Sequence, residues 1–89
     1  MNFSEQFNAI ENLKAKILLE HCLFDKQVNY CNNLKIINDD KRIGLILRDQ
    51  EIFIYKRNLK HATVCNNLFV MADDRLRISI IVTKNRTNI

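Results

Sequence analysis

The sequence predicts an α+β fold in which one N-terminal amphipathic helix precedes an antiparallel sheet. From residue 2 to residue 24, apolar side chains recur every three or four positions, which is typical of a helix. From residue 28 to residue 84, short apolar runs alternate with polar residues at the two-residue period of strands. The turns between them are short and polar, which favours an antiparallel meander, since parallel strands need long crossovers. We therefore expect a single domain over residues 1–89.

The predicted helix covers residues 2–24. Asn2 and Glu5 have the spacing of a helix N-cap and its reciprocal carboxylate. The apolar stripe consists of Phe3, Phe7, Ile10, Leu13, Ile17, His21 or Cys22, and Phe24. The stripe is widened at Leu18, Leu19 and Leu23. We therefore expect this half of the helix to be covered on two sides, by the sheet and by a second copy of the chain.

The meander over residues 28–84 should hold about five short strands, as an open sheet or a small barrel. Its clearest part is residues 42–57, where two alternating apolar arms flank the charged tetrapeptide at residues 48–51. This pattern predicts a hairpin. Because Asp49-Gln50 is not the Asn-Gly or Asp-Gly pair of a two-residue turn, we expect a four-residue loop or a bulged turn.

Other strands are expected at residues 28–31, 34–37, 62–65 and 68–71. The last two are joined by a tight turn at Asn66-Asn67, or are fused into one bulged strand. The most regular alternation is in residues 75–83. It places Leu76, Ile78, Ile80 and Val82 toward the core and Arg75, Arg77, Ser79 and Thr83 outward. The polar tail at residues 85–89 is expected to fray.

Composition excludes several classes of protein. With 47% hydrophobic and 27% charged residues the chain is globular rather than disordered. It has one glycine and no proline, so glycine-rich phosphate loops and dinucleotide motifs are excluded, and we expect no cofactor. His21 with Cys22, Cys31 and Cys65 matches no zinc-binding spacing, so we expect no metal site.

Cellular location is inferred from the cysteines and from the absence of targeting features. The chain has three cysteines. An odd number is more typical of a protein in a reducing compartment than of a domain held together by disulfides. Neither a secretory signal nor a membrane span is visible in the sequence. We expect a cytoplasmic protein, in the producing cell or in a host cell, with no membrane partner.

The two halves of the chain differ in charge. Residues 1–40 contain 4 basic and 6 acidic side chains, a net charge of −2, whereas residues 41–89 contain 10 basic and 4 acidic side chains, a net charge of +6. The sequence predicts that the strand half carries one basic surface, with Tyr55 or Phe53 for stacking on bases. The residues predicted to bind nucleic acid are Arg48, Tyr55, Lys56, Arg57, Lys60, His61, Arg75 and Arg77.

Three functions agree with this pattern. The first is a small intracellular protein without enzymatic activity that contacts RNA or DNA through its basic strands. The second is a homo-oligomeric protein-interaction module or inhibitor of the kind encoded by phages, plasmids or intracellular bacteria. The third is a small endoribonuclease toxin in which His61 acts as the general acid or base and neighbouring arginines stabilise the transition state.

Overall fold

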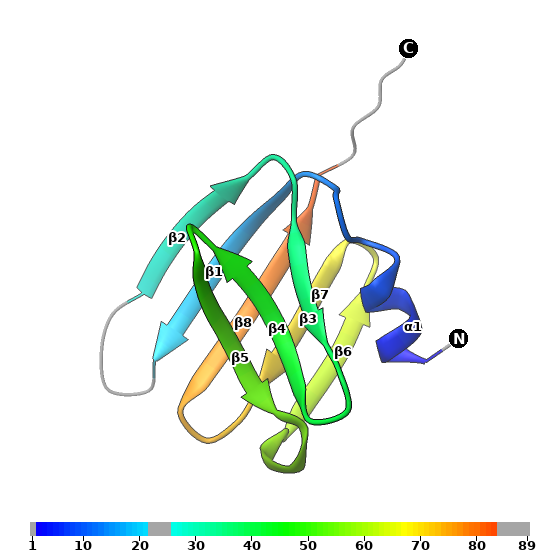
Figure 1. Cartoon of the computed structure of the whole chain (residues 1–89), viewed down its shortest axis with the longest axis vertical. Helices are drawn as coiled ribbons and strands as arrows, with labels where there is room; N and C mark the ends of the chain where they lie inside the picture. The colour runs from blue at the N-terminus through cyan, green and yellow to red at the C-terminus, as the bar shows by residue number, and fades with distance from the viewer. Residues whose placement is uncertain (1, 22–25, 84–89) are drawn as a thin grey trace.

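The computed structural model describes residues 2–21 and 26–83 and shows two antiparallel sheets with one short α-helix (Figure 1). The helical elements are α1 (Phe3–Asn8) and the single 3₁₀ turn η1 (Lys56–Asn58). The strands are β1 (Ala15–His21), β2 (Lys26–Cys31), β3 (Lys35–Asn38), β4 (Arg42–Leu47), β5 (Gln50–Tyr55), β6 (His61–Cys65), β7 (Leu68–Ala72) and β8 (Leu76–Val82).

The strands form two open sheets and not a closed barrel. The five-stranded sheet has the order β2-β1-β8-β7-β6, and the three-stranded sheet has the order β3-β4-β5. The chain leaves the five-stranded sheet after β2 and returns to it through η1, so β1 pairs with β8 from the far end of the chain. The prediction of one meander of about five strands was therefore wrong, although antiparallel pairing throughout is confirmed.

The predicted helix over residues 2–24 is much shorter in the structure. Its start is confirmed: the Asn2 side chain accepts a hydrogen bond from the Glu5 N–H at 2.9 Å, and Glu5 accepts one from the Asn2 N–H at 3.2 Å. The α-helix ends at Asn8, and Asn12 has a positive φ of 73°, which a continuing helix does not permit. Leu23 and Phe24 lie outside the described residues.

Residues 15–21 form β1 because their pattern also fits a period of two. Ala15, Ile17 and Leu19 are buried toward the three-stranded sheet, while Lys16 and Leu18 face the other way. The spacing from Ile10 to Ile17 fits a helix equally well, so the period alone does not decide between them. Pairing with both β2 and β8 provides two hydrogen-bond ladders, which a helix would lose.

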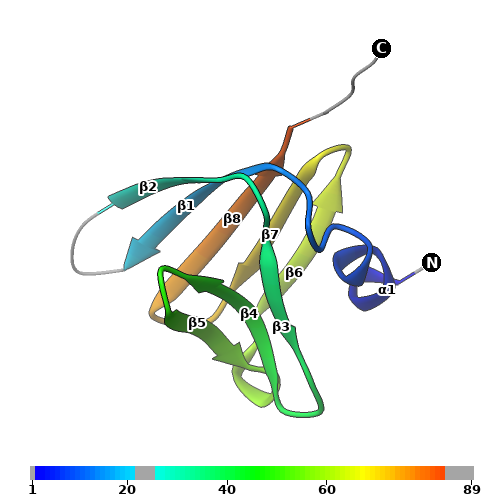
Figure 2. The same cartoon turned by 45° about the horizontal axis from the view of Figure 1, so that its top comes forward.

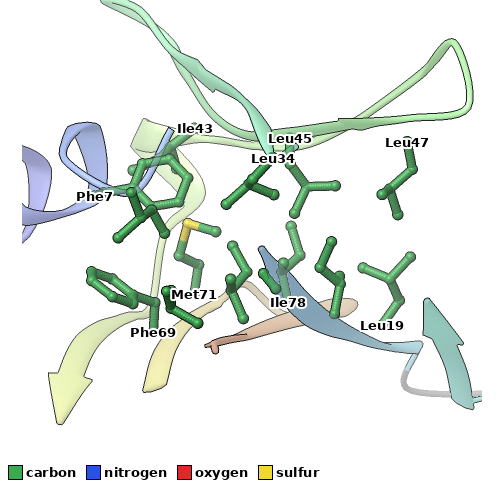
Figure 3. Close-up of a cluster of buried hydrophobic side chains, with 14 of the residues drawn as sticks. Phe7, Leu19, Leu34, Ile43, Leu45, Leu47, Phe69, Met71 and Ile78 are labelled. Atoms are coloured by element: carbon green, nitrogen blue, oxygen red, sulfur yellow. The ribbon is translucent and has the colours of Figure 1, made fainter. Parts of the chain in front are cut away.

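The core lies between the inner faces of the two sheets (Figure 3). Leu45 and Leu47 point from the three-stranded sheet toward Ile78 and Leu19 of the five-stranded sheet. Phe7 of α1 closes one side of this layer. Its ring lies 6.3 Å from that of Phe69. Figure 2 shows that the three-stranded sheet lies on one side of the five-stranded sheet and that α1 lies beside its β6 edge.

The β4–β5 hairpin is confirmed, but its turn is tighter than expected. Leu47 pairs with Gln50, so Arg48 and Asp49 alone form the loop. Both have positive φ, 49° and 69°, as a two-residue type I′ turn requires. The register of the two arms therefore imposes a backbone conformation that the residue types do not favour.

The remaining strands largely follow the sequence pattern. Cys65 pairs with Leu68 across a two-residue turn that begins at Asn66, whose φ is 55°, so β6 and β7 are separate strands and not one bulged strand. In β8, Ile78, Ile80 and Val82 are buried in the core, and Leu76 packs partly against it. Ser79 faces outward as expected, yet it is only 8% exposed between β1 and β7.

Within residues 2–21 and 26–83, no helix has the length and apolar character needed to cross a membrane. The tail at residues 85–89 lies outside the described residues.

Substituting Gly44 with alanine should destabilise the fold. Gly44 lies opposite Phe53, and a Cβ here would lie within 3.0 Å of the Ile52 carbonyl oxygen and of the Phe53 Cα and Cβ. Two of these atoms are backbone, so the β4–β5 pair would have to separate. We expect Gly44→Ala to lower the free energy of unfolding by about 3 kcal/mol in urea denaturation. Lys35→Ala, on the exposed face of the same sheet, is the control, and equal stability of the two variants would contradict this account.

Replacing the β4–β5 turn with Asn-Gly should stabilise the protein. Arg48 and Asp49 adopt left-handed conformations that cost L-residues about 1 kcal/mol each, whereas asparagine and glycine favour them. The double variant Arg48→Asn/Asp49→Gly should therefore raise the free energy of unfolding by about 1–2 kcal/mol, measured by urea denaturation. Unchanged or reduced stability would mean that the turn is not under conformational strain.

Candidate nucleic-acid interface

Most of the predicted basic residues meet at one end of the molecule, at the bottom of Figure 1, where the β5–β6 connection adjoins the β7–β8 turn. The Lys60 N–H donates a hydrogen bond to the Ala72 carbonyl at 2.7 Å, which ties the two segments together. One hollow is lined by Arg57, Asn58, Lys60, Asp73, Asp74 and Arg75. The structure thus brings together cations that are far apart in the sequence.

Tyr55 provides the aromatic surface at this end. It is the last residue of β5, it lies opposite Arg42, and 40% of it is exposed. The Arg57 guanidinium lies over the Tyr55 ring, 4.9 Å from its centroid. The Phe53 ring meets Tyr55 edge to face, with 5.2 Å between centroids. Tyr55 is therefore held in place by Phe53 and carries a cation on its face.

Lys41 also belongs to this group, although the sequence did not identify it. The Lys56 N–H donates a hydrogen bond to the Lys41 carbonyl at 2.8 Å, which extends the β4–β5 ladder beyond Tyr55. The basic corner is defined here as Tyr55 with five cations, which are Lys41, Lys56, Arg57, Lys60 and Arg75. Lys41 could have been identified from the hairpin pairing, because it directly precedes β4 and therefore lies opposite the residue that follows β5.

Three of the predicted site residues lie outside the basic corner. Arg48 is in the β4–β5 turn, and β5 separates it from Tyr55 by about 20 Å at strand rise, so its grouping with the others was wrong. His61 and Arg77 lie at the border of the corner, on the outer face of the five-stranded sheet, where they flank Ala72. They line a second hollow together with Lys60 and Arg75.

Carboxylates accompany these cations, which the sequence did not predict. The first hollow holds three cations and two aspartates, a net charge of +1, and Glu20 joins Asp73 and Asp74 in the second. Asp73 Oδ1 is already occupied, because it accepts hydrogen bonds from the Arg75 and Leu76 N–H groups, both at 2.8 Å. The corner is therefore basic, but only moderately so.

The cations of the corner are not paired with these carboxylates. In the described part of the chain, ion pairs join Lys26 to Glu20 and Arg42 to Asp39 and Glu51, and none involves the five cations of the basic corner. Arg42 contacts Asp39 and Glu51 at 2.9 and 3.1 Å, and its guanidinium lies 5.0 Å from the Phe53 ring centroid. These contacts raise the pKa of Arg42, chiefly through its hydrogen bond to Asp39. The Arg42 guanidinium is therefore already paired with two carboxylates.

The arrangement provides five cations and one partly exposed aromatic ring. Among the described residues, no group of three or more histidine, cysteine, aspartate or glutamate side chains is placed to hold a metal ion. His21 lines the same hollow as His61, but it continues the inward-facing set of β1, whereas His61 belongs to the outward-facing set of β6. The two imidazoles are therefore not placed as an acid and base pair on one face.

Comparisons of the chain with protein-family models, with curated proteins and with solved structures found no match.

The β3–β4 turn beside the corner should make stability depend on pH. The Lys41 N–H, and then the Arg42 N–H and guanidinium, donate to Asp39 and hold its pKa below the usual value of 3.8. A carboxylate with a lowered folded pKa stabilises the fold above the unfolded value, and this contribution is lost as the pH falls through the folded pKa. Asp39→Ala should therefore lower the urea midpoint at pH 7, with a smaller difference from the wild type at a pH below 3.8.

Asp40→Ala is the matched control for this measurement, because Asp40 is the neighbouring exposed carboxylate of the same turn. It should leave the urea midpoint nearly unchanged at both pH values. A loss of stability in Asp39→Ala that is the same at every pH would show that the carboxylate charge is not the cause.

Proposed function

We propose that the protein is a non-enzymatic binding protein that contacts single-stranded nucleic acid through the basic corner. The observation that supports this most strongly is the Arg57 guanidinium over the exposed Tyr55 ring, surrounded by cations that form no ion pair in the described residues. A nucleic acid presents phosphates and flat bases together, and a corner of this kind complements both.

The expected affinity is modest, because few charges take part. The five cations of the corner adjoin four aspartates, Asp73 and Asp74 on one side and Asp39 and Asp40 beside Lys41 and Tyr55. Asp39 and Asp73 already accept hydrogen bonds from backbone N–H groups. Binding should therefore depend on a small number of phosphate contacts and on stacking at Tyr55. The partner is taken to be single-stranded, since stacking on a protein side chain requires an unpaired base face.

Two other functions remain hypotheses. The endoribonuclease hypothesis draws on His61, which shares its hollow with His21 and with the carboxylates Glu20, Asp73 and Asp74. The protein-interaction hypothesis gains support from a different surface, the outer face of the five-stranded sheet, where several large apolar side chains are exposed.

Binding should weaken steeply with salt and should depend on Arg57 and Tyr55. We expect fluorescence anisotropy with a labelled single-stranded 20-mer of RNA or DNA to give a log–log salt slope of about −3, corresponding to about four phosphate contacts. Arg57→Glu should weaken binding by about tenfold or more and reduce the slope. Tyr55→Ala should also weaken it by about tenfold, whereas Tyr55→Phe should retain most of the affinity.

Arg48→Glu is the matched control, since it makes the same charge change at the far end of β5. It should reduce the affinity far less than Arg57→Glu. Equal losses in the two variants would show attraction by the net charge alone, with no localised site. An absence of binding by the wild-type protein at low salt would overturn the proposed function.

A further inference from the structure

The outer face of the five-stranded sheet is an ordered array of side chains. The strand register places them in three rows that run across the sheet. The charged row at the basic-corner end is Lys26, Glu20, Arg77, Ala72 and His61. The middle row is Val28, Leu18, Ser79, Val70 and Thr63. The third row is Tyr30, Lys16, Ile81, Leu68 and Cys65.

This face exposes most of the large apolar surface of the molecule. Six large hydrophobic residues are exposed among the described residues, and four of them lie here: Val28, Tyr30, Leu68 and Ile81 at 49%, 78%, 38% and 39% exposure. Both α1 and the three-stranded sheet lie away from this face, so neither covers it (Figure 2). Lys16 lies between Tyr30 and Ile81, so the exposed apolar side chains form two groups, Val28 with Tyr30 and Ile81 with Leu68. Exposed apolar groups on a small protein generally mark a site of association.

We propose that this face binds a second copy of the same chain, related by a two-fold axis that runs along the middle row. The charged side chains of this face indicate that its partner is a second copy of the chain. Such an axis exchanges the charged row with the third row and keeps each strand over its own counterpart. Glu20 then faces Lys16 of the second copy, and the contact occurs twice, as in any isologous interface.

The remaining contacts across this axis are mixed: those of β1 and β2 are favourable, whereas Arg77 faces the aliphatic Ile81 of the second copy and meets no opposite charge there. Lys26 faces Tyr30 of the second copy, a cation near an aromatic ring, as Lys16 already is at 5.9 Å within one chain. Leu18 and Val28 face their own counterparts. The central residue, Ser79, is small and only 8% exposed, so it permits the two sheets to approach closely.

The other simple arrangement is unfavourable. A two-fold axis parallel to β8 would place Arg77 against Arg77 of the second copy. Like charges in direct opposition oppose association. The charge pattern therefore favours one orientation, in which the strands of the two copies run antiparallel across the interface, rotated by about 30° through sheet twist.

The area is compatible with a dimer. Five strands about 4.8 Å apart and five to seven residues long, at about 3.3 Å per residue, give a flat area of roughly 500 Å². Side chains project from this plane, so the accessible area is larger than the flat area. It approaches the roughly 800 Å² that each partner buries in a stable interface. A chain of 89 residues also has a small core, so association would add to its stability.

A charge-swap experiment tests the dimer directly. Sedimentation equilibrium of the full chain should show a monomer–dimer equilibrium for the wild type. Lys16→Glu places a carboxylate against Glu20 of the second copy, and Glu20→Lys places an ammonium group against Lys16. Each single variant should weaken dimerisation by about tenfold, because every change acts twice in the interface. The double variant Lys16→Glu/Glu20→Lys restores opposite charges and should recover most of the wild-type affinity.

Urea denaturation of each variant shows whether it is folded. Should a single variant be unfolded, Val28→Ser, at an exposed edge position, serves in its place and should also weaken the dimer. A wild-type chain that stays monomeric at high concentration would overturn the proposal, including the case in which this face binds a different protein. A double variant that dimerises no better than the single ones would overturn it too. None of these measurements uses nucleic acid, so they are independent of the proposed function.

Discussion

The packing of the two inner sheet faces on each other is the constraint on which the rest of the structure depends. The strands have four to seven residues, too few to be stable as isolated hairpins, so each depends on this shared core. The sheets are unequal, with five strands against three. Phe7 fills the side near β6, whereas at the other edge β2 turns the polar residues Gln27 and Asn29 inward. The three-stranded sheet covers only the inner face of the wider sheet, so the outer face of the wider sheet stays uncovered.

The strand half of the fold could be predicted because its strands alternate and its turns are polar. The β4–β5 hairpin, β8 and the break at Asn66 all follow from local pattern. The residue types of β1 did not distinguish a strand from a helix, because the run from Ile17 to Leu19 is apolar on both faces. Only its partners decide, and β8 is some 60 positions away in the sequence. The three-stranded sheet covers Leu19 on the inner face of β1, whereas coverage of Leu18 by a second copy stays a prediction.

The basic corner could be predicted in part because several of its residues lie close together in the sequence. Lys56, Arg57 and Lys60 are neighbours in the sequence, so their grouping required no knowledge of the fold. Arg75 joins them only through the antiparallel register of β6, β7 and β8, which was assumed in outline. The same register brings Asp73 and Asp74 to the corner. The sequence predicts a turn at these aspartates, but it does not show that their carboxylates lie beside the cations of the corner and partly neutralise them.

The charged row links the two surfaces, because His61 and Arg77 border the basic corner and also belong to the face proposed to bind a second copy. A second copy would cover these two residues and leave Tyr55, Arg57 and Lys60 at the end of the molecule. Since the proposed axis exchanges the two ends of the strands, the two corners of a dimer would lie at opposite ends, separated by at least the length of β8, about 23 Å. Dimerisation would then neither build nor block the basic corner. Each corner would bind its own segment of single-stranded nucleic acid, and the affinity of one corner should be independent of the concentration of the chain.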